Sequence, residues 1–129
     1  MHTIKIAAAA IILTLLIITT GIIASHNLSK SSDKIESYIS GIETNIKSSN
    51  WKKADSDLSN MKKEWKKIGT GWSILIDHIE IDNIDNSISR LSSFIRSKDS
   101  TEILAESSNL RQYIKHIPEK ESFNLKNIL

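Results

Sequence analysis

The stretch of residues 51–68 reads "WKKADSDLSNMKKEWKKI" and shows the clearest periodicity in the chain. Its apolar side chains recur at alternating spacings of three and four residues without a break. They are Trp51, Ala54, Leu58, Met61, Trp65 and Ile68. An α-helix repeats every ~3.6 residues, so this spacing places all six side chains on one face. We predict a helix over residues 51–68, with Asn50 as its N-cap and Gly69 as its stop.

Three further stretches show the same periodicity. Apolar stripes predict helices over residues 33–48, 72–97 and 100–117, the last ending before Pro118. Capping boxes are predicted at Asp33 with Glu36 and at Asp99 with Glu102. The linkers are short, which makes sequential helices antiparallel neighbours. The predicted fold class is all-α, an up-down antiparallel four-helix bundle.

The C-terminal tail, residues 118–129, reads "PEKESFNLKNIL". It is short but holds Phe123, Leu125, Ile128 and Leu129, which a frayed polar terminus would not need. We predict that the tail folds back and covers an end or groove of the bundle. The alternative is an apolar tail that docks a partner.

The N-terminal stretch, residues 6–24, reads "IAAAAIILTLLIITTGIIA". As a helix these nineteen residues would span about 28 Å, close to the thickness of a bilayer core. We predict that residues 1–25 form a single-pass transmembrane signal anchor in the cell membrane, with the N-terminus inside and the bundle, residues 26–129, outside. The alternative is a signal peptide cleaved near Thr19, Thr20 and Gly21, which would leave a secreted bundle.

The charge balance argues against a nucleic-acid partner. Seventeen Lys and Arg, all but Lys5 beyond the apolar stretch, face fifteen Asp and Glu. Nucleic-acid binding favours a concentrated basic face, which this near-balance lacks. With no cysteine in the chain, disulfides and a cysteine nucleophile are excluded.

Residues 75–85, "LIDHIEIDNID", hold the candidate functional patch: Asp77, His78, Glu80, Asp82 and Asp85. On a helix His78, Asp82 and Asp85 follow a solvated strip, where His78 and Asp82 could hold a metal only with ligands from another helix. Asp77 and Glu80 fall close to the apolar stripe, and a carboxylate that faces a core must be paired, protonated or bound to a ligand.

The predicted partners of Asp77 and Glu80 are the lysines of "MKKEWKK" on the preceding helix. They are Lys62, Lys63, Lys66 and Lys67. This pairing would be structural, and the alternative is a ligand or partner site. Trp51, Trp65 and Trp72 are assigned to the core rather than to a ligand cage.

The tryptophan-bearing helix, "HIEIDNIDNSISRL" and the terminal "HIPEKESFNLKNIL" carry a resemblance. The chain resembles a clostridial-type family of small N-terminally anchored helical proteins, domain of unknown function 4363. Members are often encoded beside a multi-pass membrane protein, so the resemblance implies a membrane partner. It supplies no catalytic residues and no cofactor.

The sequence therefore favours a non-enzymatic, membrane-tethered interaction module that binds another membrane protein. No Gly-x-Ser-x-Gly elbow or phosphate-binding loop is present. The alternative is an extracytoplasmic sensor, or a ligand- or metal-binding bundle, that uses the region of Asp77 and Glu80. The oligomeric state is left open.

Overall fold

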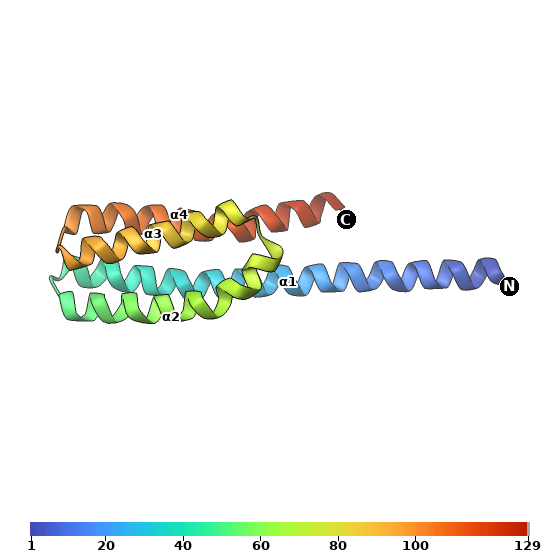
Figure 1. The fold of residues 1–129 in the computed structure, drawn as a ribbon. Coiled ribbons are helices and arrows are strands. Elements are labelled where there is room, and N and C mark those ends of the chain that lie inside the picture. Colours follow the sequence, from blue (N-terminus) through green and yellow to red (C-terminus); the bar gives the residue numbers. More distant parts are fainter. Residues whose placement is uncertain (129) are drawn as a thin grey trace.

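The computed structural model describes residues 1–128, with the side chains of residues 1–121 and 127. Four helices follow one another: α1 (His2–Lys47), α2 (Trp51–Leu75), α3 (His78–Arg96) and α4 (Ser100–Ile128). α1 packs against α2 and α4, and α3 packs against the same two helices. The predicted all-α, up-down antiparallel four-helix bundle is confirmed (Figure 1).

α1 is one continuous helix that combines the predicted anchor with the first bundle helix. The predicted start near Asp33 is wrong, because the helix passes through that residue without a break. Its first buried side chain is Leu28. The N-terminal part of α1 projects beyond the bundle (Figure 1). This N-terminal part is long and apolar enough to cross a membrane, and none of its most apolar window is buried.

The turn between α2 and α3 lies later in the chain than predicted. α2 continues through Gly69 and Gly71 to Leu75, and Trp72 belongs to α2 rather than to the next helix. The buried Trp72 ring meets Trp65 edge to face, with ring centroids 5.4 Å apart. Each interior glycine costs a helix about 1 kcal/mol, which burial of a tryptophan outweighs. The turn itself is Ile76 and Asp77, both with extended backbone.

The core is built from the predicted stripes. Its fully buried large side chains are Ile35, Ile39, Ile42, Met61, Ile84, Leu91, Ile103, Leu110, Ile114 and Ile117. Trp65 and Trp72 are buried, and the half-buried Trp51 packs against the same cluster. The assignment of the tryptophans to the core is confirmed.

The two turns at the other end of the bundle share one geometry. Ser49 and Lys98 both have positive φ, and the next residue in each turn donates its backbone N–H to a carbonyl five residues earlier. This pattern is the Schellman ending of a helix. Asp99 then caps α4, because the Glu102 N–H donates to its carboxylate at 3.2 Å. The Asp99 cap of the predicted capping box is therefore present.

The predicted end of the last helix before Pro118 is wrong, because α4 continues to Ile128. The predicted fold-back is wrong as well, because residues 118–128 extend the same helix. A proline inside a helix removes the hydrogen bond to the carbonyl four residues earlier, here that of Ile114. The buried Ser32 hydroxyl of α1 donates to this carbonyl at 3.0 Å, which compensates for the loss. The predicted covering roles of Phe123, Leu125, Ile128 and Leu129 fall on side chains outside the described residues.

Candidate functional site

Glu80 is the most enclosed member of the predicted patch. It lies in the first turn of α3, and its carboxylate accepts a hydrogen bond from Lys120 of α4 at 3.1 Å. The Nε2 atom of His116, one helical turn before Lys120, lies 3.9 Å from the same oxygen. The hydrogen bond to Glu80 and its charge hold the pKa of Lys120 above its usual value. Glu80 therefore joins α3 to α4.

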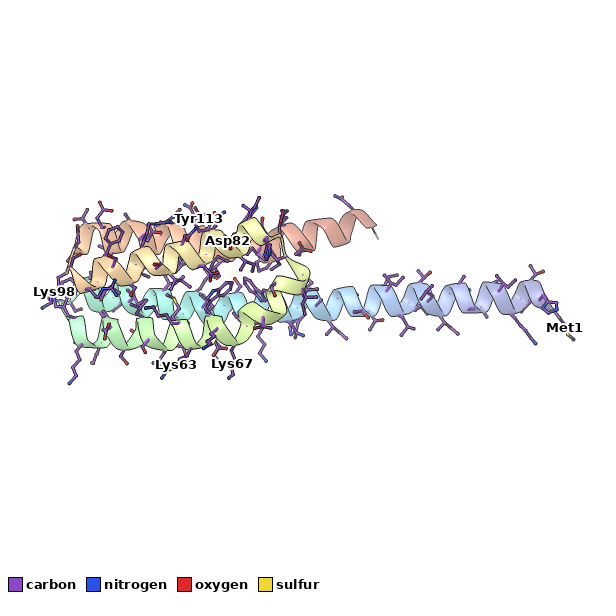
Figure 2. All side chains as sticks on the ribbon, viewed as in Figure 1. Met1, Lys63, Lys67, Asp82, Lys98 and Tyr113 are labelled. Atoms are coloured by element: carbon purple, nitrogen blue, oxygen red, sulfur yellow. The ribbon has the colours of Figure 1, made fainter. Side chains whose placement is uncertain are left out.

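The predicted partners of Glu80 on α2 are wrong. Lys62 donates instead to the Ser92 hydroxyl at 2.8 Å, farther along α3. The later turn shifts the register, so Lys62 lies opposite Ser92 rather than Glu80. Figure 2 shows Lys63 and Lys67 on the outer side of α2, away from Asp82.

The other members of the patch separate into different surroundings. Asp77 is the N-cap residue of α3, exposed and without a side-chain cap hydrogen bond. His78 and Asp82 are exposed, in agreement with the predicted solvated strip. Asp85 is exposed too, but its carboxylate accepts a hydrogen bond from the Trp65 indole at 2.6 Å. Asp77 lines the same pocket as Glu80, whereas His78, Asp82 and Asp85 do not.

A pocket of about 300 Å³ lies beside Glu80, between the start of α3 and the second half of α4. Its lining residues are Asp77, Ile79, Glu80, Asn83, Tyr113, His116 and Ile117. A carboxylate, an imidazole and a phenol could together bind a small polar molecule. Among the residues that the structure describes, no group of three or more His, Cys, Asp or Glu is placed to hold a metal ion.

Tyr113, His116 and Lys120 were not part of the predicted patch. They recur at spacings of three and four residues, so they share one face of α4. That spacing was visible in the sequence. The sequence analysis did not group these residues, because it ended the helix before Pro118 and so placed Lys120 outside the helix that contains His116.

A second hollow, a groove of about 370 Å³, lies where α1 enters the bundle. α1 contributes Thr20, Ile23, Ala24, Asn27, Leu28 and Ser31, and α2 contributes Lys67, Ile68, Gly71, Trp72 and Leu75. The groove therefore begins in the apolar N-terminal segment and continues onto the bundle. A Cβ atom added to Gly71 would meet no atom within 4 Å, so the groove is open at this point.

Polar contacts fix α4 against its neighbours farther along the bundle. Glu106 of α4 accepts hydrogen bonds from Ser87 at 2.7 Å and from Arg90 at 3.0 Å, both on α3. Burial acts to raise the pKa of Glu106, but hydrogen bonds from Arg90, Ser87 and Asn109 outweigh it and hold that pKa below its usual range. The Arg111 guanidinium donates a hydrogen bond to the carboxylate of Glu43 on α1 at 3.0 Å. This hydrogen bond raises the pKa of Arg111.

Comparison with known proteins identifies one family through the helical bundle. Neither the curated proteins nor the solved structures contain a match to it. The model of one family matches residues 22–128, which cover the bundle and the last residues of the apolar segment. The chain belongs to that family, described as a domain of unknown function (DUF4363).

Proposed function

We propose that the protein is a non-enzymatic, membrane-tethered interaction module that binds another membrane protein. In this proposal residues 6–24 of α1 span the cytoplasmic membrane, and the bundle stands on its outer face. The observation that carries the proposal is the groove between α1 and α2. Ile23 and Ala24 belong to the apolar segment, whereas Trp72 and Leu75 belong to the bundle, and all four line it.

The position of this groove favours a partner that is itself in the membrane. Its α1 wall includes the outer end of the segment that would span the bilayer. An apolar helix of another membrane protein could therefore enter it from the lipid side, where small residues allow close approach. Ala24 of α1 and Gly71 of α2 are the small residues on its two walls.

The contacts of the acidic patch support a structural rather than a catalytic role. Glu80 holds α4 through Lys120, and Asp85 holds α2 through Trp65. Such contacts set the relative positions of helices. They are the kind of compensation that carboxylates near a core require.

Photo-crosslinking in cells tests the proposal. The full chain carries a photoreactive residue at Ile23, inside the groove, or at Ile12, which is exposed in the middle of the apolar segment. We expect Ile23 to give one discrete adduct with a membrane-embedded protein that Ile12 does not give. Identical adducts from both positions would contradict the proposal.

Two glycine substitutions sharpen this test. Gly71→Leu places a side chain in the groove, where its Cβ atom would meet no atom within 4 Å, and we expect it to abolish the adduct. Gly69→Ala is the matched control. A Cβ there would lie 3.6 Å from the Trp65 ring, an ordinary contact outside the groove, so the adduct should remain.

The pocket beside Glu80 favours a second candidate, an extracytoplasmic sensor or ligand-binding bundle. The juxtaposition of Glu80, His116 and Tyr113 at its wall is the supporting observation. Zinc chloride or inorganic phosphate, added to the full chain in micelles, should then shift the His116 imidazole resonances. Glu80→Gln should weaken the response to zinc. If neither addition shifts His116, this candidate fails for both kinds of ligand.

A further inference from the structure

The turn between α2 and α3 carries an exposed apolar surface. Ile74 is 82% exposed, Ile79 67% and Leu75 49%. Outside α1, these three are all the exposed large apolar side chains in the part of the chain whose side chains are described. We call them the apolar rim. Single exposed apolar residues need no explanation, but three gathered at one turn do.

The two turns at the opposite end of the bundle are polar, so helix reversal in this bundle does not require apolar residues. The turn between α1 and α2 is Ser48, Ser49 and Asn50, and the turn between α3 and α4 is Ser97, Lys98 and Asp99. Both reverse the chain with polar residues only. The rim is therefore a property of one end of the molecule rather than of helix reversal.

The apolar rim lies at the level where the apolar segment of α1 ends. Leu75 lines the same groove as Ile23 and Ala24, so the end of α2 stands beside the last residues of that segment. Figure 1 shows this turn at the end of the bundle from which the N-terminal part of α1 projects. If residues 6–24 span a bilayer, the rim stands at the boundary between lipid and water.

α4 reaches the same level. Ser32 and Ile114 stand side by side in the antiparallel pair of α1 and α4. From Ser32 back to Ala24 is eight residues, about 12 Å of helix, whereas from Ile114 to Ile128 is fourteen residues, about 21 Å. The backbone of α4 therefore runs past the end of the bundle on the side of the apolar segment (Figure 1).

We infer that the apolar rim of Ile74, Leu75 and Ile79 is a lipid-contact surface, which inserts into the interfacial region of the bilayer beside the anchor. The inference rests on the proposed tether, because the rim meets lipid only if residues 6–24 span the membrane. Ile74 and Ile79 do not line the groove and contact lipid, whereas Leu75 stands where the rim meets the groove. Apolar side chains at the lipid boundary hold a domain against the membrane and restrict its tilt.

Depth measurements in vesicles test the inference. The chain has no cysteine, so single cysteines can be labelled with an environment-sensitive fluorophore. The full-length variants Ile74→Cys and Ile79→Cys report on the rim, Ile12→Cys on the span, and Lys52→Cys on the far end. Each is reconstituted into phosphatidylcholine vesicles, with and without phosphatidylglycerol. Quenchers are nitroxides on shallow or deep lipid positions and aqueous iodide.

We expect shallow lipid nitroxides to quench labels at 74 and 79 several-fold more strongly than at 52, and iodide to show the reverse order. The pattern should persist in high salt and without the anionic lipid, because the rim has no charge. Iodide quenching at 74 and 79 equal to that at 52 would overturn the inference. Protection from iodide without lipid quenching would overturn it as well, and would indicate a second copy of the chain over the rim.

The label at position 12 separates the two proposals. Strong quenching at 12 by deep nitroxides, together with aqueous labels at 74 and 79, rejects the lipid contact and leaves the tether intact. An aqueous label at 12 rejects the tether and the lipid contact together. Circular dichroism of each variant confirms the helical fold, and the two rim positions are measured independently.

Discussion

The Ser32 hydroxyl donates a hydrogen bond to the carbonyl of Ile114, which is the carbonyl that Pro118 leaves without an intrahelical partner. Both partners are buried. One contact from α1 thus lets α4 continue through a proline, and it also fixes the relative height of the two helices.

Removal of this hydroxyl should destabilise the bundle in a way that depends on the proline. Ser32→Ala leaves a buried carbonyl unpaired, which costs about 1–3 kcal/mol in the free energy of unfolding. In a Pro118→Ala background the backbone N–H of residue 118 can satisfy the same carbonyl, so Ser32→Ala should cost much less. Chemical unfolding of the four variants, followed by circular dichroism, measures the coupling. Equal costs in the two backgrounds would show that the contact does not compensate for Pro118.

Trp65 should be the most sensitive single position on α2. It is buried, it contacts Trp72 edge to face and it donates to Asp85. Trp65→Ala should cost about 3–5 kcal/mol in the free energy of unfolding. Asp85→Ala removes only the acceptor of the indole N–H and should cost about 1 kcal/mol. Asp82→Ala, an exposed neighbour on α3, is the control and should change stability by less than about 0.5 kcal/mol. An Asp85→Ala variant as stable as Asp82→Ala would rule out a role for the indole contact.

Glu106 should make the bundle sensitive to acid. Its pKa in the folded chain lies below its usual range, so the unfolded chain takes up a proton first as the pH falls. The stability that this carboxylate contributes is complete above the usual pKa of about 4.3 and is lost as the pH falls through the lower folded value. Glu106→Gln should therefore be less stable than the native chain at neutral pH and lose less stability on acidification. The exposed Glu102→Gln is the control, and an identical acid response in Glu106→Gln and the native chain would contradict this prediction.

Periodicity was sufficient to predict the bundle, because a side chain's position in a stripe depends only on its own helix. The stripe of Ile35, Ile39, Ile42 and Ile46 is buried as predicted. The helix ends were harder, because distant contacts decide them. Gly69 and Gly71 did not stop α2, because Trp72 adds a buried contact beyond them. Pro118 did not stop α4, because the hydroxyl of Ser32, 86 positions earlier in the chain, pairs with the carbonyl that the proline leaves free.

The candidate patch shows the same limit. The sequence identified Glu80 as a carboxylate that needs a partner, and the structure pairs it with Lys120. The predicted lysine partners followed from a turn placed near Gly69. A turn at Ile76 and Asp77 shifts the register of α2 against α3, and α4 then supplies the partner.

In our proposal residues 6–24 span the membrane and the bundle stands outside the cell. Single cysteines in the cysteine-free chain test it most directly, with a membrane-impermeant maleimide on intact cells. Thr3 and Lys52 are both exposed, and they lie on opposite sides of the proposed span. We predict that Lys52→Cys reacts in intact cells, whereas Thr3→Cys reacts only after the membrane is permeabilised. Labelling of Thr3→Cys but not of Lys52→Cys in intact cells, or release of the protein by high salt alone, would contradict the account.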